Sequence, residues 1–241
     1  MITIERIYPE ELDRNSEDDQ NTLSIHLQRY QFASAELCGR RILDMACGCG
    51  YGTALLASQH PDKEFIGVDI DPSAIAYAQT HYSLPNLNYV CANALTFTAT
   101  DLFDTIISLE TIEHLPHPQQ LVANFARLLN RAGQIIASVP ITPTLDGNPH
   151  HLHDFTRPSF FKLFKAHDLK PTRHFEQIQW WQFKGLFAKS PVKQHRSSGV
   201  GNAVLNYYRK HPFYLLRRLQ SMLRYGFSNR YLTCVFTVSA L

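Results

Sequence analysis

Short apolar runs alternate with amphipathic stretches along the first 180 residues. The apolar runs are rich in β-branched and aromatic residues and end at turn formers, which predicts strands over residues 41–45, 65–69, 87–91, 104–108 and 134–139. Apolar residues at helical spacing predict helices over residues 22–38, 53–59, 72–81 and 119–130. Alternating strands and helices indicate βαβ units, and therefore an α/β fold with a doubly wound, mostly parallel sheet.

The pattern is less regular beyond residue 140. A stretch rich in turn formers and histidine follows Val139, and then a helix is predicted over residues 158–167 and a strand within 172–180. A last strand is predicted over residues 231–239. In sheets of this kind, ligands bind at the carboxyl ends of the strands, and candidate functional residues are therefore sought there.

A glycine-rich turn follows the first predicted strand. In LDMACGCGYGT the strand ends at Asp44, and glycines stand at positions 48, 50 and 52 before the next helix. Glycine allows the backbone to approach a ligand closely, which is typical of a nucleotide-binding loop. A dinucleotide fingerprint would need glycine at position 53, where this chain has threonine, and a hydride-transfer enzyme is thereby disfavoured.

Several motifs, in order, resemble those of class I S-adenosylmethionine-dependent methyltransferases of the small-molecule and glycan type found in bacterial polysaccharide clusters. The first motif matches the loop, with Ala46 at its usual first glycine, and Asp69 matches the acid that binds both ribose hydroxyls. Asn93 stands at the usual aspartate that receives the adenine amino group, and an amide oxygen can accept the same bond. The resemblance implies S-adenosyl-L-methionine as cofactor, bound by Arg29, Asp44, Ala46, Gly48, Gly50, Asp69, Ile70, Asn93, Ala94, Ser108 and Glu110.

Two further segments carry the resemblance. The helix ahead of the first strand contains His26, Arg29 and Tyr30, similar to an H-x-x-R-Y signature in which Arg29 would grip the cofactor carboxylate with two hydrogen bonds. The alternative is a helix that caps the sheet and carries a solvated arginine. The run FDTIISLETIEHLPHP at 103–118 resembles the segment that flanks the methionine moiety.

The resemblance covers roughly residues 22–180 and the last strand. It implies a Rossmann-like sheet of seven strands, mostly parallel with an antiparallel last strand, in a single methyltransferase domain over residues 1–241. We expect an N-terminal helical cap (1–40), a cofactor-binding core (41–180), a basic aromatic helical insertion (181–229) and the last strand (230–241).

Histidine is the candidate catalytic residue. A hydroxyl acceptor benefits from a base near neutral pKa, and His114, His150 and His151 are the predicted bases because they fall near the mouth of the site. The HHLHD run lacks the i, i+4 spacing of a helical metal pair, so no metal is predicted. An N-P-P-aromatic motif is missing after the fourth strand, which disfavours a DNA adenine or glutamine-amide acceptor.

Charge is distributed unevenly along the chain. Residues 177–241 contain ten Lys or Arg and no acid, so they carry +10 while the rest carries −8. This asymmetry predicts an anionic partner. The basic aromatic stretch 204–227 suits peripheral contact with a membrane surface, and the alternative is an insertion that packs on the sheet.

The predicted function is therefore O-methylation of a sugar hydroxyl or another small-molecule acceptor. An anionic or lipid-linked glycan is an acceptor of this kind. An RNA methyltransferase and a cofactor-binding protein without catalysis are the alternatives, with nucleic acid the less favoured partner.

No apolar run approaches the length of a bilayer span, and five cysteines form no CxxC pair. These features predict a cytoplasmic protein, with peripheral contact at the inner face of the membrane.

Overall fold

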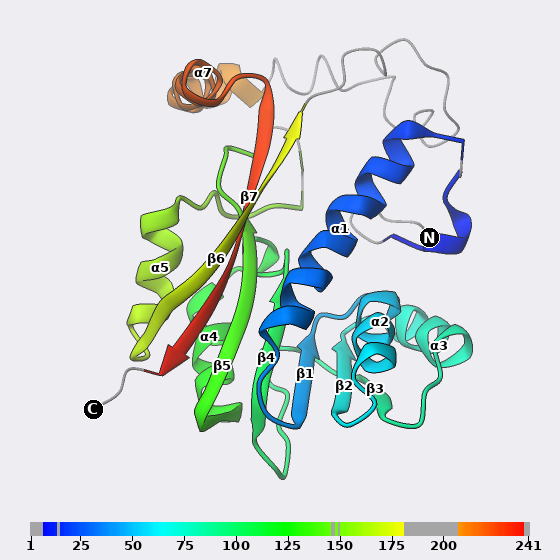
Figure 1. Ribbon diagram of the computed structural model, residues 1–241. Coiled ribbons are helices and arrows are strands. Elements are labelled where there is room, and N and C mark those ends of the chain that lie inside the picture. The colour runs from blue at the N-terminus through cyan, green and yellow to red at the C-terminus, as the bar shows by residue number, and fades with distance from the viewer. Residues whose placement is uncertain (1–6, 14, 146–147, 149, 181–206, 239–241) are drawn as a thin grey trace.

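The computed structural model describes residues 7–13, 15–145, 148, 150–180 and 207–238 (Figure 1). Its strands form one seven-stranded sheet in the order β3-β2-β1-β4-β5-β7-β6. Their bounds are β1 Arg41–Met45, β2 Glu64–Asp69, β3 Leu87–Cys91, β4 Phe103–Leu109, β5 Leu129–Pro140, β6 Leu169–Trp180 and β7 Ser228–Val238. Pairs among β1 to β5 are parallel, and β7 runs antiparallel to both β5 and β6. The predicted fold class is confirmed.

Helices cover both faces of the sheet (Figure 1). Their bounds are α1 Glu17–Glu36, α2 Tyr51–Gln59, α3 Pro72–His81, α4 Pro118–Leu128, α5 Arg157–Lys165 and α7 Pro212–Tyr225, with short 3-10 turns η1 Pro9–Glu11 and η2 Ile112–His114. One buried cluster joins α4 and α5 to the sheet, and a second joins α1 and α2 to it. The sheet is therefore the middle layer, and its central strands β1 and β4 are buried almost throughout because both of their faces are covered.

Tyr30 explains why the second residue of α2 is a glycine. A Cβ added at Gly52 would lie 2.0 Å from the Tyr30 ring, so α1 can approach α2 this closely only over a glycine. The hydroxyl of Tyr30 then reaches Asp44 at the end of β1, at 3.2 Å. The H-x-x-R-Y helix thus packs directly on the glycine-rich loop.

Several predicted boundaries differ from the structure, and the largest shifts are at the starts of β5 and α1. The helix predicted over 119–130 ends at Leu128, and β5 begins at Leu129 instead of at 134, because Leu129 is extended and pairs with Phe103 before a register shift. The helix predicted from residue 22 begins at Glu17, because the Ser16 side chain accepts a hydrogen bond from the Asp19 amide and caps a polar first turn. The pattern of apolar positions does not mark the start of β5 or the start of α1, so it could not predict either one.

The predicted insertion is described in part. Residues 181–206 lie outside the described part of the chain, as do 1–6 of the predicted cap and 239–241 of the last strand. Within the described portion, α7 falls in the predicted insertion and β7 starts at Ser228, just before the predicted boundary. Among the described residues, no helix is both long enough and apolar enough to cross a bilayer.

Candidate cofactor and acceptor site

The loop between β1 and α2 has open space beside its backbone at Gly48. The amides of Ala46 and Cys47 donate to the Val68 carbonyl, at 2.7 and 3.0 Å, and fix the loop to β2. Ala46, Gly48 and Gly50 all have positive φ, at 67°, 59° and 85°. A Cβ added at Gly48 would meet no heavy atom within 4 Å, so a ligand can come close to the backbone there. This cradle fits the predicted cofactor.

Asp69 closes β2 beside this loop. Its Oδ2 accepts a hydrogen bond from the Gly48 amide at 2.9 Å, and its Oδ1 accepts one from the Asp71 amide at 2.9 Å. The side chain is only 5% exposed. A carboxylate is an acceptor-only group with about four acceptor positions, which is the chemistry that binding of two ribose hydroxyls requires.

Asp44, near the end of β1, is buried between α1 and α2. Its Oδ2 accepts hydrogen bonds from the Thr53 hydroxyl at 2.6 Å and from Tyr30 at 3.2 Å, and the residue is 1% exposed. Burial raises the pKa of Asp44 to about 6, and the charge of Asp69 raises it too, while the two hydroxyl donors lower it. The structure therefore places Asp44 as a support for the loop.

Arg29 is buried against three partners from distant segments. Its Nε donates to Gln177 Oε1 at 2.9 Å, one terminal nitrogen lies 3.8 Å from Glu110 Oε2, and the guanidinium lies 4.5 Å from the centre of the Tyr231 ring. The solvated alternative is wrong, since Arg29 is 3% exposed. The sequence analysis did not find Gln177 or Tyr231 as partners of Arg29, because no local pattern links residues so far apart along the chain.

The end of β4 is held by β5. The Glu110 amide donates to Ser138 Oγ at 3.0 Å, and that hydroxyl donates to Glu110 Oε1 at 2.7 Å. Glu110 has a φ of 50°, an uncommon conformation for this residue type, and strained residues of this kind cluster at functional sites. Ser108 differs, because its side chain is fully buried.

The predicted adenine contacts lie at the ends of β2 and β3. Ile70 is 62% exposed directly after Asp69, which makes it an apolar surface at the strand end. Asn93 is exposed, and its Oδ1 accepts a hydrogen bond from the Leu95 amide at 2.9 Å. Ala94 is half-buried, and its carbonyl accepts from Asn124 at 2.7 Å. The adenine contacts of Ile70, Asn93 and Ala94 stay a prediction.

Two of the three predicted catalytic histidines come together. The rings of His114 and His151 lie 4.6 Å apart, centre to centre, in an edge-to-face arrangement. His150 is exposed, and it contributes its carbonyl oxygen, which lies 3.2 Å from His114 Nδ1. Burial lowers the pKa of His151 to about 4, and His114 and His150 shift it the same way. His151 is therefore neutral at neutral pH.

A fully buried carboxylate stands next to this pair. Glu113 Oε1 lies 3.9 Å from His114 Nε2, and the Glu113 carbonyl accepts hydrogen bonds from the amides of Leu152 and His153, at 2.8 and 3.2 Å. These bonds fasten the segment after β5 to η2. The sequence placed Glu113 in a motif, but it gave no sign that His151 would lie beside it.

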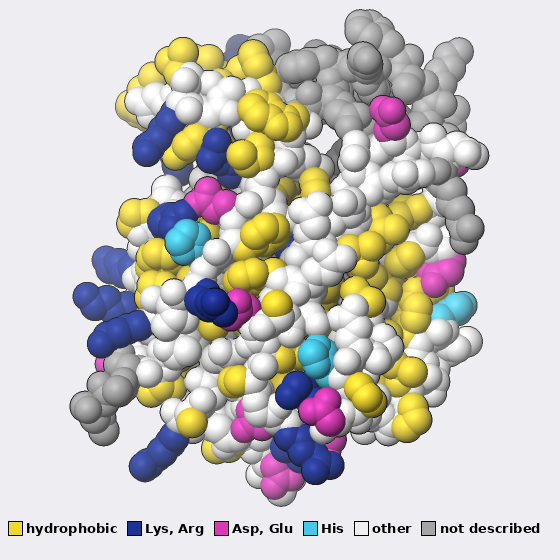
Figure 2. Space-filling model, viewed as in Figure 1, with side chains coloured by type: hydrophobic (Ala, Val, Ile, Leu, Met, Phe, Trp, Pro, Cys, Tyr) yellow, Lys and Arg dark blue, Asp and Glu magenta, His cyan; other side chains and the backbone are white. Residues whose placement is uncertain are grey.

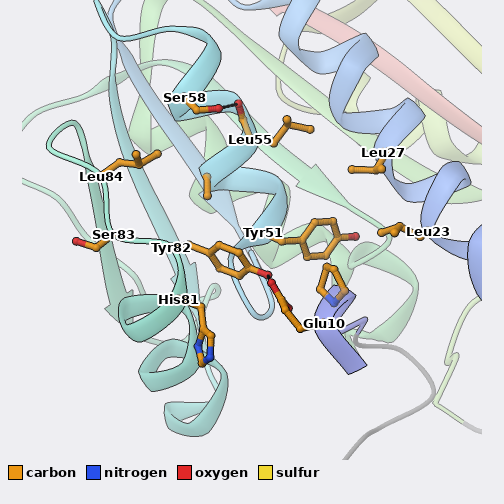
Figure 3. A pocket seen from close by; sticks show the side chains of 12 residues that line it. Glu10, Leu23, Leu27, Tyr51, Leu55, Ser58, His81, Tyr82, Ser83 and Leu84 are labelled. Carbon is orange, nitrogen blue, oxygen red and sulfur yellow. Dashed lines mark hydrogen bonds between the residues drawn. The ribbon is translucent and has the colours of Figure 1, made fainter. Parts of the chain in front are cut away.

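An apolar pocket lies elsewhere, between α1, α2 and the turn after α3 (Figure 3). It has a volume of about 450 Å³, and Tyr82 points across it to Glu10, with an O–O distance of 2.5 Å. Its described lining includes Leu23, Leu27 and Leu55 but none of the predicted cofactor residues. The pocket is therefore distinct from the loop and Asp69.

The strand order and the glycine-rich loop are those of the Rossmann-like methyltransferase fold. Residues 42–133 match the family model described as a methyltransferase domain. The predicted resemblance to class I methyltransferases, whose cofactor is S-adenosylmethionine, is thereby confirmed.

One similar curated protein is phthiotriol/phenolphthiotriol dimycocerosates methyltransferase from Mycobacterium leprae, 30% identical over 129 residues. That match covers 53% of this chain and 47% of the relative, so the chain spans about half the length of this relative.

Solved structures show the same fold across more of the chain. The N-methyltransferase NodS from Bradyrhizobium japonicum, in complex with S-adenosyl-L-homocysteine, matches with a TM-score of 0.59 and 14% identity, over 94% of this chain and 90% of NodS. The cyclase SpnF matches with a TM-score of 0.63 and 13% identity, over 96% of this chain and 86% of SpnF. Because one neighbour is a cyclase, the fold alone does not establish methyl transfer.

Proposed function

We propose that this protein is an S-adenosylmethionine-dependent methyltransferase that methylates a hydroxyl of an anionic small-molecule or glycan acceptor. The observation that carries the proposal is the cradle at the carboxyl ends of β1 and β2. There an open backbone at Gly48 lies beside the Asp69 carboxylate, which can accept hydrogen bonds from two ribose hydroxyls.

When bound, S-adenosylmethionine supplies a methyl carbon that its sulfonium already activates. The chain's residues bind and orient it. Asp69 would hold the ribose, Ile70 would contact the adenine ring, and Asn93 with Ala94 would receive the adenine amino group. Arg29 would bind the cofactor carboxylate with guanidinium nitrogens other than the Nε that donates to Gln177. Glu110, with Ser108 buried behind it on β4, would border the methionine moiety.

The acceptor hydroxyl is activated beside His114 and His151. Both follow strands β4 and β5, whose carboxyl ends share an edge of the sheet with the loop and Asp69. Holding the hydroxyl in line with the methyl carbon can supply roughly 7–11 kcal/mol of barrier lowering. Proton transfer to an imidazole is one way in which the pair acts, typically worth about 10²–10⁴-fold. His150, which is exposed, is the less suitable base.

An arginine-lined pocket supports the anionic acceptor. It has a volume of about 610 Å³ and is bordered by Ile141 and Pro143, which follow β5 and precede the segment that carries His151. Four guanidinium groups line it, from Arg157, Arg217, Arg224 and Arg230. Glu176 pairs with Arg157 and Arg230, and Asp154 pairs with Arg217. The four arginines outnumber the two carboxylates that pair with them, and this excess of positive charge favours a phosphate-bearing acceptor.

The exposed face of α7 supports a lipid-linked form of this acceptor. Phe213 and Leu223 are 83% and 90% exposed, and Figure 2 shows apolar side chains at the surface over α7 with basic ones next to them. A helix with an apolar face and basic neighbours suits an anionic membrane surface. Because α7 also lines the arginine pocket, that surface would present the headgroup of a lipid near the site.

Two measurements test the proposal in sequence. Calorimetry with S-adenosylhomocysteine reports cofactor binding, for which we expect one site per chain. Transfer of a labelled methyl group to fractionated cell extract then separates an enzyme from a cofactor-binding protein without catalysis. Label in an anionic lipid or glycan fraction is the expected result, and label in RNA alone or in no fraction contradicts it.

A further inference from the structure

The cluster of Glu113, His114 and His151 carries chemistry beyond a pair of bases. Each residue offers one ligand atom, and the three atoms lie within 4.8 Å of one another. Glu113 comes from η2 and is fully buried, while His151 comes from the segment after β5. The spacing along the sequence predicted no metal, but the fold brings a carboxylate and two imidazoles to one point.

The hydrogen bonds around the two imidazoles match those of metal ligands. His114 Nδ1 lies 3.2 Å from the His150 carbonyl oxygen, and His151 Nδ1 lies 2.6 Å from Thr144 Oγ1. Each contact fixes one ring nitrogen, and His114 Nε2 then lies 3.9 Å from Glu113 Oε1. Metal-bound histidines almost always have their other nitrogen held in this way, since the outer contact sets the ring orientation and the tautomer.

We propose that Glu113, His114 and His151 bind one divalent first-row transition metal ion, such as Zn²⁺ or Co²⁺. Two imidazole nitrogens and one carboxylate oxygen suit such ions better than Mg²⁺, which prefers oxygen ligands in an octahedron. Three protein ligands leave coordination positions open for an oxygen atom from outside.

The role of the ion rests on the proposed function, whereas its binding does not. An acceptor hydroxyl that takes an open position has its pKa lowered by the cation. The O–H bond then breaks, the proton leaves to solvent water and the oxygen keeps the electron pair with which it attacks. In the metal-bound protein the imidazoles hold the cation, and they do not take the proton.

Binding is tested on the full, untagged chain after metal removal by a chelator, with Co²⁺ as the probe and its visible absorption as the signal. We expect one Co²⁺ per chain, displacement by an equal amount of Zn²⁺, and little competition from Mg²⁺. Glu113→Gln and His151→Ala should each weaken binding at least roughly 100-fold. Thr144→Val removes the outer contact of His151 and a longer hydrogen bond from the Thr144 hydroxyl to Asp154 Oδ1, at 3.4 Å, but no proposed ligand. It should weaken binding roughly 10- to 100-fold.

His174→Ala is the matched control, because His174 is exposed on β6 and belongs to no such cluster among the described residues. Its affinity for Co²⁺ should equal that of the unchanged protein. Equal affinity in the unchanged protein, His151→Ala and Thr144→Val would overturn the proposal, as would no binding at all. Calorimetry with S-adenosylhomocysteine on the same samples reports the cofactor site separately, so a failed metal site and a failed cofactor site are distinguished.

Discussion

The Asp69 carboxylate accepts a hydrogen bond from the Gly48 amide at 2.9 Å, and this contact joins the end of β2 to the loop after β1. One side chain thus fixes the loop and offers a hydrogen-bond acceptor beside the loop's open backbone. Cofactor binding and loop geometry therefore depend on the same residue.

Replacement of Asp69 by alanine should weaken the binding of S-adenosylhomocysteine. Hydrogen bonds to a charged group contribute about 1.5–3 kcal/mol, so we expect roughly a 10- to 100-fold rise in Kd by calorimetry. Asp101→Ala is the control, because this exposed acid precedes β4 at the opposite edge of the sheet. Unchanged affinity in Asp69→Ala would remove the ribose assignment.

Ala46→Gly should stabilise the protein. Ala46 has a φ of 67°, where a non-glycine residue costs roughly 1–2 kcal/mol, and the greater entropy of an unfolded glycine offsets part of the gain. We expect the free energy of unfolding in urea to rise by about 1 kcal/mol. The same change at Ala76, exposed in the interior of α3, should lower it by about 1 kcal/mol. A loss at both positions would contradict the strain at Ala46.

His26 should make stability depend on pH. Burial lowers the pKa of His26 to about 3 from 6.5, and Arg29 lowers it too. The unfolded chain therefore binds more protons between these values, and this contribution to the free energy of unfolding falls as pH decreases from about 6.5 towards 3. His26→Gln should lose less stability than the unchanged protein when urea unfolding is repeated at pH 7 and pH 5.

Tyr51→Phe is the matched control for that experiment. It removes the hydrogen bond between the Tyr51 hydroxyl and His26 Nδ1, which are 3.1 Å apart, but it leaves the partly buried imidazole in place. The loss between pH 7 and pH 5 should persist in this variant. If His26→Gln and Tyr51→Phe lose equal stability between pH 7 and pH 5, a group other than His26 is responsible for the loss at low pH.

Substitutions on α7 test the membrane contact. Phe213→Ser combined with Leu223→Gln removes the two most exposed apolar side chains of α7, each worth about 1.5–3 kcal/mol when buried. Cosedimentation with vesicles that contain phosphatidylglycerol should fall at least roughly 10-fold. Leu102→Gln, 42% exposed just before β4, should leave it unchanged. Equal cosedimentation of the double variant and the unchanged protein would exclude α7 as the contact.

Periodicity and turn chemistry were sufficient to predict most of the sheet. β1 and β3 have the predicted bounds, and α3 begins where Asp71 and Pro72 indicate, because the Asp71 side chain accepts from the Ser73 amide at 2.8 Å. The start of β5 at Leu129 was not predictable, since it depends on pairing with Phe103 in a distant segment.

The site was predictable where it follows a strand end. Asp69 and the loop are local in sequence, so a motif finds them. The contacts of Arg29 with Gln177 and of Thr144 with His151 arise only when separate segments fold together. Ala46 shows a different limit, because alanine adopts a left-handed conformation here that its residue type disfavours, and the bonds of the loop to β2 impose it.

A crystal structure of the protein with S-adenosylhomocysteine would test the central claim most directly. We expect the nucleoside at the ends of β1 and β2, with both ribose hydroxyls on the Asp69 carboxylate and the amino-acid end over the backbone of Gly48. A nucleoside bound elsewhere, or no density for it at millimolar ligand, would contradict the account.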